Sequence, residues 1–183
     1  ALLVRARVGL RGPDIGDAIV NKRRALHAVV QFPGWPQLHV FGFYLVVGTG
    51  VRGGNARILA EIGARVADIA FPVLLAGDWN TAPREVEESG FPGGAELVLV
   101  APSLPTCITP TSSRTIDFFA TTDPTRRLLE SVAVDLSWPK RPRMPITIGL
   151  STNGLHQQYL VYSVAAQLGT QRLIGPARQG PSW

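Results

Sequence analysis

The sequence predicts an α/β protein made of packed β-sheets flanked by helices. Three observations support this fold class: short apolar segments recur along most of the chain, one segment has clear helical periodicity, and proline or glycine separates the segments. The 183 residues, 45% of them hydrophobic and 17% charged, suit one compact domain with its own core. We expect this domain over residues 1–150 and a partly extended C-terminal extension over 151–183.

The expected strands follow one another with turns between them. Residues 3–10 alternate apolar and basic side chains, as a half-exposed strand does. Two longer strands, at 25–32 and 37–47, flank the turn Pro33-Gly34-Trp35-Pro36 and form an antiparallel hairpin. Further strands are expected at 73–76, 96–100, 115–120, 131–134 and 146–150.

The clearest helix is expected at 55–70, after a glycine-containing loop. Its apolar residues share one helical face: Ile58, Leu59, Ile62, Val66 and Ile69. Pro72 ends this helix. Pro83 is suited to the first position of a second, short helix, which Gly90 ends.

The charge balance favours an anionic partner. Lysine and arginine number 18 against 13 acidic residues, which gives a net charge of +5. Only Lys22 and Lys140 are lysines, so arginine carries nearly all of the positive charge. The planar arginine fork binds phosphate well. Nucleic acid is therefore a candidate partner, although a general arginine bias explains the composition equally well.

The sequence also excludes some classes of protein. Cys107 is the only cysteine, so an internal disulfide is impossible and a cysteine-based zinc site is implausible. No apolar run has the roughly 20 residues that cross a bilayer, and the first residues do not resemble a signal peptide. We expect no membrane partner and an intracellular location, with the nucleus as one candidate compartment.

Two polar groups follow the apolar strand at 73–76, in the tetrad Gly77-Asp78-Trp79-Asn80. A strand that stops on polar residues delivers them to one mouth of a sheet, where ligand sites are common. Asp78 can orient or deprotonate a water, and Asn80 can donate to a phosphate oxygen. The same residue types also occur in ordinary turns.

A third polar group, Asp117, lies in the otherwise apolar strand at 115–120. A buried carboxylate without a partner costs several kcal/mol, so Asp117 requires a partner or a solvated mouth. It either pairs with Arg114 or orients another catalytic side chain.

These motifs, in this order and strand context, resemble those of the endonuclease/exonuclease/phosphatase superfamily. This superfamily includes deoxyribonuclease I, apurinic endonucleases and the endonuclease modules of non-LTR retrotransposons. A strand ending at Tyr44 precedes the motifs here, as it does in the superfamily. The resemblance covers roughly residues 1 to 150 and implies a four-layered, two-sheet α/β sandwich of the deoxyribonuclease I type. Residues 4–10 resemble the strand that follows the superfamily's first motifs, so we expect the N-terminal portion of the domain to be absent.

The resemblance implies a catalytic set of Tyr44, Asp78, Asn80 and Asp117. Asp78 would position or deprotonate the attacking water, and Asn80 would bind the scissile phosphate. Tyr44 would approach the phosphate or the leaving oxygen, and Asp117 would orient a histidine. The implied cofactor is Mg²⁺ or Mn²⁺, with metal ligands that this sequence does not identify.

The chain departs from the superfamily at Arg143, which stands where a catalytic histidine is expected. An arginine there could pair with Asp117 and hold a phosphate, but it cannot act as a base at neutral pH. We expect Arg143 and Arg114 to bind substrate. The other histidines in the predicted strands, His27 and His39, are expected to be packing or surface residues.

Two functional hypotheses follow. The first is a hydrolase: a metal-dependent phosphodiesterase, and specifically a retroelement-type endonuclease that cleaves the DNA backbone by activated-water attack. The alternative is a catalytically inactive remnant or nucleic-acid-binding module that keeps the fold. Arg143 and the expected absence of the N-terminal motifs support the alternative. Both hypotheses predict nucleic acid, with DNA first, as the partner.

Overall fold

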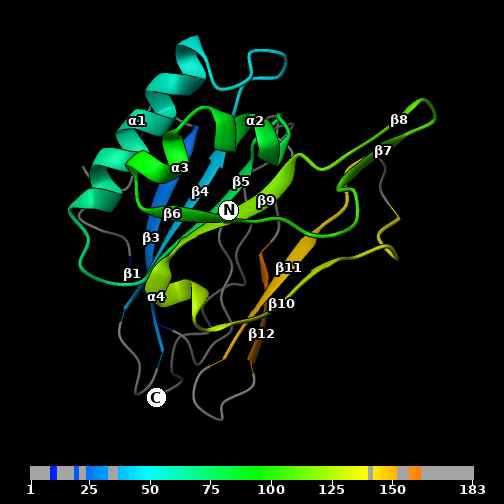
Figure 1. Ribbon diagram of the computed structural model, residues 1–183. Helices are drawn as coiled ribbons and strands as arrows, with labels where there is room; N and C mark the ends of the chain where they lie inside the picture. The colour runs from blue at the N-terminus through cyan, green and yellow to red at the C-terminus, as the bar shows by residue number, and fades with distance from the viewer. Residues whose placement is uncertain are drawn as a thin grey trace, which may run out of the picture.

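The computed structural model describes residues 9–11, 19–20, 24–32, 37–139, 142–151 and 157–161. They form a two-sheet α/β sandwich, as predicted (Figure 1). Helices cover one face of the larger sheet, and a smaller sheet packs on its other face. The described residues thus supply three of the four predicted layers. None of their helices is both long and apolar enough to cross a membrane.

The larger sheet has seven strands within the described residues, in the order β1-β3-β4-β5-β9-β6, with β2 paired to β3. The strands are β1 (Gly9–Arg11), β2 (Ile19–Val20), β3 (Ala25–Gln31), β4 (Leu38–Tyr44), β5 (Val73–Asp78), β6 (Leu97–Val100) and β9 (Asp117–Thr122). The predicted hairpin of β3 and β4 is confirmed. Strand β5 is parallel to β4 and antiparallel to β9. Its side chains also enter the core on both faces of the sheet, which explains its unbroken apolar run.

Three helices pack on one face of the larger sheet: α1 (Gly53–Ala67), α2 (Pro83–Glu88) and α3 (Phe91–Gly94) (Figure 1). The short helix α4 (Asp123–Arg126) follows the end of β9. Helix α2 begins at Pro83 as predicted. Helix α1 begins at Gly53 rather than 55, because the carbonyl of Arg52 accepts from the backbone N–H groups of Asn55 and Ala56. The short helices α3 and α4 were not predicted.

Two smaller sheets complete the described fold. Strands β10 (Leu129–Val134), β11 (Ile146–Leu150) and β12 (Gln157–Val161) form one sheet, in that order. Strands β7 (Cys107–Thr109) and β8 (Ser112–Arg114) form a hairpin that projects from the body in Figure 1. Strands β7, β8 and β12 were not predicted. Most of the strand predicted at 3–10 and the turn at 33–36 lie outside the described residues.

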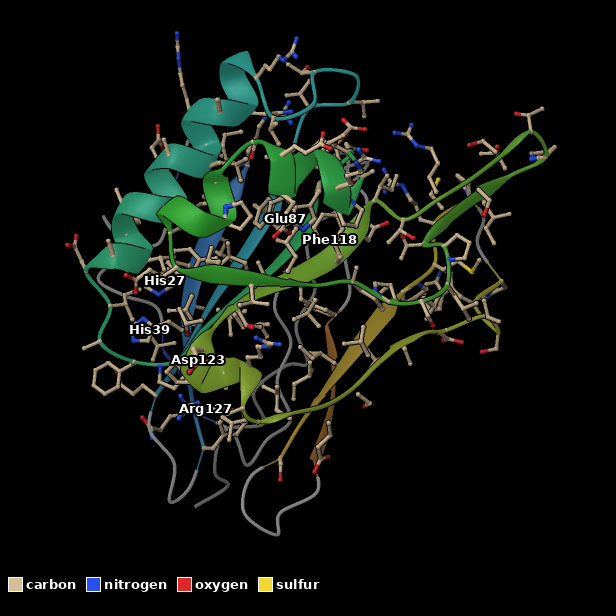
Figure 2. All side chains as sticks on the ribbon, viewed as in Figure 1. His27, His39, Glu87, Phe118, Asp123 and Arg127 are labelled. Atoms are coloured by element: carbon tan, nitrogen blue, oxygen red, sulfur yellow. The ribbon has the colours of Figure 1, made fainter. Side chains whose placement is uncertain are left out.

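The core is divided by the larger sheet. One cluster packs between this sheet and α1, and the other packs between the two sheets. On the α1 side, Trp79 is fully buried and stacks on Phe118 with 4.7 Å between ring centroids. Figure 2 labels Phe118 close to α2. Gly77 lies beside the ring of Phe43, where a Cβ atom would come within 2.3 Å of Cζ. A side chain at this position of β5 would therefore have to displace the buried ring of Phe43.

Candidate functional site

The strand register places three polar side chains in one row across the larger sheet. Tyr44 at the end of β4 is paired with Asp78 at the end of β5. Asp78 is in turn paired with Asp117 at the start of β9. Directly paired residues present their side chains on the same face of a sheet. Because Leu74 and Phe119 on these strands belong to the core between the two sheets, the row lies on that inner face. The predicted convergence of the three residues is present.

The guanidinium of Arg143 contacts the two carboxylates of this row. Nη1 of Arg143 donates to Asp78 Oδ1 and to Asp117 Oδ2, at 3.0 Å in each case. Its Nη2 donates to Asn80 Oδ1 at 2.8 Å and lies 2.9 Å from Asp78 Oδ2. The side chains of Asp78 and Asp117 are each only 3% exposed, whereas that of Arg143 is 26% exposed. Arg143 therefore covers the carboxylates and presents one edge to solvent.

The backbone around Arg143 is held in place by β7. The N–H of Ile108 donates to the carbonyl of Pro142 at 2.9 Å, and the N–H of Met144 donates to the carbonyl of Thr106 at 2.8 Å. Arg143 itself forms an isolated bridge with this strand. The β7–β8 hairpin, which the sequence did not reveal, thus positions the arginine.

Thr106 joins the two sides of the site, although it was not among the predicted site residues. Its side chain is fully buried, and its Oγ1 accepts from the backbone N–H groups of both Ile116 and Asp117, at 3.0 Å each. The carbonyl of Thr106 accepts from the backbone N–H of Met144, the residue that follows Arg143. One threonine therefore sets the position of Asp117 relative to Arg143.

The charge of the cluster follows from burial and from the neighbouring charges. The pKa of Asp78 is raised from 3.8 to about 6, first because burial disfavours the carboxylate and second because Asp117 is negative. The positive charge of Arg143 and its hydrogen bond to Asp78 lower the pKa of Asp78, but by less. Burial alone would lower the pKa of Arg143, but the charges of Asp117 and Asp78 outweigh it and raise that pKa above its ordinary value. At neutral pH Asp78 is therefore mostly a carboxylate, and Arg143 is a guanidinium.

Asn80 is locked at the end of the row. Its Nδ2 donates to the carbonyl of Leu45 at 2.7 Å, while its Oδ1 faces Arg143. Its backbone N–H donates to Asp78 Oδ1 at 3.2 Å. Its φ of 50° lies in the left-handed region, which asparagine tolerates better than most residues. Backbone geometry and side-chain contacts therefore both favour asparagine here.

Tyr44 lies beside a second arginine that sequence reasoning missed. The guanidinium carbon of Arg24 is 5.4 Å from the centroid of the Tyr44 ring, within the range of a cation–π contact. The carbonyl of Arg24 accepts from the N–H of Tyr44 at 2.8 Å. The row therefore has an arginine near each end. The position of Arg24 beside Tyr44 follows from the register of β3 against β4, which the sequence alone does not specify.

The other predicted residues lie apart from this cluster. Arg114 is exposed on β8, and the ion pair that the structure gives to Asp117 is with Arg143 instead. The interpretation that Asp117 pairs with Arg114 is therefore wrong. His27 and His39, which lie close together in Figure 2, approach each other at 2.9 Å between ring nitrogens. The ring of His27 also stacks on that of Phe41. The two histidines lie on the α1 side of the sheet, so their prediction as packing residues is confirmed.

The expected Mg²⁺ or Mn²⁺ does not fit these residues as they are arranged. Carboxylate and amide oxygens are suitable ligands for such ions. However, both oxygens of Asp78, Oδ2 of Asp117 and Oδ1 of Asn80 already lie within 3.0 Å of an Arg143 nitrogen. A divalent cation among them would face the positive guanidinium at short range. The described residues also contain no cluster of three or more His, Cys, Asp or Glu side chains that could hold a metal ion.

Comparison with known proteins agrees with the fold. No protein-family model and no curated protein matches the sequence. Among solved structures, the endonuclease domain of TRAS1, a telomere-specific non-LTR retrotransposon, has a TM-score of 0.63 and 13% identity, covering 80% of this chain and 70% of that one. The 3′-5′ exonuclease NExo from Neisseria meningitidis has a TM-score of 0.56 and 16% identity, covering 79% and 71%. The chain has the endonuclease/exonuclease/phosphatase fold.

Two further structures share this fold with the chain. One is NExo from Neisseria, described as a 3′ phosphatase bound to a product DNA hairpin, with a TM-score of 0.54 and 16% identity over 80% of this chain and 71% of that one. The other is the cytolethal distending toxin of Haemophilus ducreyi, with a TM-score of 0.51 and 14% identity over 77% and 57%. The resemblance read from the tetrad Gly77-Asp78-Trp79-Asn80 and from Asp117 is thus confirmed as a fold.

Proposed function

We propose that this chain is a phosphodiesterase-type domain that acts on the DNA backbone, as an endonuclease. The observation that carries the proposal is the row of Tyr44, Asp78 and Asp117 at one end of the central strands. It lies in a fold shared with an endonuclease domain and with an enzyme bound to a DNA product. The proposal includes an intracellular location, with the nucleus as the candidate compartment.

Asp78 is the residue suited to activate water. A general base works best when its pKa lies near the working pH, and the pKa of Asp78 is raised to about 6. At pH 7 it is mostly ionised and can accept a proton. Both of its oxygens face Arg143, however. A water therefore reaches Asp78 only when the guanidinium moves away from it.

A backbone phosphate is the natural competitor for that guanidinium. Arginine binds carboxylate and phosphate through the same planar fork. In the proposed reaction, Arg143 moves from Asp78 to the phosphate and offsets the negative charge that develops on it. The hydroxyl of Tyr44 donates to the phosphate or the leaving oxygen. Because Arg143 is a permanent cation, these steps require no proton from it.

A second candidate function is DNA binding without cleavage. It is favoured by the contacts of Arg143 with Asp78, Asp117 and Asn80 together, which leave none of these groups free to act. In this alternative the guanidinium stays between the carboxylates. Its exposed edge, with Tyr44 and Arg24, would meet the DNA backbone.

Nicking of supercoiled plasmid DNA separates the two functions. The full chain would be incubated with plasmid in Mg²⁺ and in EDTA, beside Asp78→Asn and the control Asp68→Asn, which alters an exposed residue beyond α1. Nicking by the chain and by the control, but not by Asp78→Asn, supports the endonuclease. DNA binding that weakens steeply with salt, without nicking, supports the second candidate. The absence of both nicking and DNA binding would contradict both functions.

A further inference from the structure

One guanidinium contacts all three carboxylate and amide side chains of this cluster. Four N···O contacts of 2.8–3.0 Å connect Arg143 to Asp78, Asp117 and Asn80. The two nitrogens involved carry four hydrogens, so these contacts use the full Nη donor capacity. The position between the carboxylates is therefore filled by a cation that belongs to the chain.

The surroundings keep this cation in place. The carboxylates are almost fully buried, so each depends on a partner for its charge. The segment carrying Arg143 is bonded to β7 on both sides, through Ile108 and Thr106. Asn80 cannot turn its oxygen elsewhere without losing its bond to the carbonyl of Leu45. The arrangement is thus a closed site in which one guanidinium offsets part of the charge of the two carboxylates.

We propose that the guanidinium of Arg143 replaces a divalent cation at this site, so that the native chain binds DNA without Mg²⁺ or Mn²⁺. The DNA part of this inference rests on the proposed function, whereas the cation part does not. Removal of Arg143 would leave Asp78 and Asp117 facing each other, with the oxygen of Asn80 nearby. Such a set of hard oxygen donors binds divalent cations. The substitution should therefore create a metal site that the native chain lacks.

Mn²⁺ binding to the chain without DNA tests this directly. The free Mn²⁺ signal in electron paramagnetic resonance would be titrated with native protein, Arg143→Ala and Arg143→Gln, each first checked for folding by circular dichroism. We expect each neutral variant to bind Mn²⁺ at least tenfold more tightly than the native chain does. Arg143→Lys, which keeps the charge but not the fork, should stay at the native level. Asp78→Asn added to Arg143→Gln should abolish the gain.

DNA affinity measured at constant ionic strength provides the second arm. We expect the native chain to bind a DNA duplex equally well in EDTA and in Mg²⁺. Mn²⁺ binding by the native chain as tight as that of the neutral variants would overturn the proposal. So would an affinity for DNA at least tenfold lower in EDTA than in Mg²⁺. A chain that binds neither DNA nor Mn²⁺, while its neutral variants bind Mn²⁺, would contradict the proposed function but support the replacement of the cation.

Discussion

Asp78 and Asp117 lie directly opposite each other on β5 and β9, and their carboxylates accept from the same nitrogen, Nη1 of Arg143. Two buried carboxylates side by side repel each other, and burial penalises the charge of each. The shared donor offsets part of both effects. The pair and its arginine therefore behave as one unit, whose charge state depends on pH.

Stability should fall as the pH rises through the range in which Asp78 ionises. Its pKa is raised from 3.8 to about 6, so the folded chain binds its proton more tightly than the unfolded chain does. The protonated side chain of Asp78 therefore favours the folded state. This contribution to the free energy of unfolding is complete below about pH 4, is lost between about pH 4 and 6, and is absent at higher pH. Its size is about 3 kcal/mol at most, at 1.36 kcal/mol per pKa unit. Urea unfolding at several pH values would measure it.

Asp78→Asn should flatten this part of the pH profile, because the substituted side chain no longer titrates. The control Asp68→Asn, an exposed position, should keep the native profile. An unchanged slope in Asp78→Asn would mean that another group, such as Asp117, causes the pH dependence.

Thr106→Val should destabilise the chain by about 2–4 kcal/mol, because it leaves two buried backbone N–H groups without their acceptor. Thr121→Val is the matched control. The hydroxyl of Thr121 is also buried but has no hydrogen-bond partner within the described structure, so its replacement should cost about 0.5 kcal/mol or less. Chemical denaturation would compare the variants. Equal effects at the two positions would contradict the bridging role of Thr106.

Gly77→Ala should destabilise the fold by about 3 kcal/mol, because the new Cβ would overlap the ring of Phe43. Gly54→Ala should instead stabilise by about 0.5 kcal/mol, since this α1 position has open space around it. Thermal unfolding of both variants would check the opposite signs. The double variant Gly77→Ala with Phe43→Leu should recover part of the loss. If it does not, the clash with the ring is not the cause.

Asn80→Ala should be less stable than Asn80→Gly by about 1 kcal/mol. Both variants lose the bonds to Leu45 and Arg143, but only alanine is strained at a φ of 50°. At Asn55, within α1, the order should reverse, because glycine weakens a helix relative to alanine. Denaturant unfolding of the four variants tests both rankings. The same order at both positions would contradict the backbone explanation.

Local patterns were sufficient to predict much of the fold and part of the site. The end of an apolar strand placed Asp78 at a sheet mouth, and the spacing of aliphatic residues predicted α1. The pairing of β3 with β4 followed from the turn between them. Tyr44 and Asp117 were predicted to join Asp78 through the resemblance, and the strand register brings the three together.

The remaining features depend on contacts between distant segments. Arg143 contacts Asp78 across 65 residues of sequence, and no local pattern states which nitrogen meets which oxygen. The role of Arg24 depends on the β3–β4 register. Strands β7 and β8 are too short and too polar to have a clear period, so their part in placing Arg143 was not predictable. Helix α4 is a single turn and has the same difficulty.

The attachment of Arg143 to β7 also affects how fast the site can respond. Because the backbone on either side of it is hydrogen-bonded to Thr106 and Ile108, the guanidinium can leave the carboxylates only by rotation of its own side chain. Loop and domain motions take nanoseconds to milliseconds, and the departure of this partly exposed side chain requires none of them. The rate at which the guanidinium leaves the carboxylates therefore depends on the lifetime of its four polar contacts. No rearrangement of the backbone has to precede the arrival of a ligand.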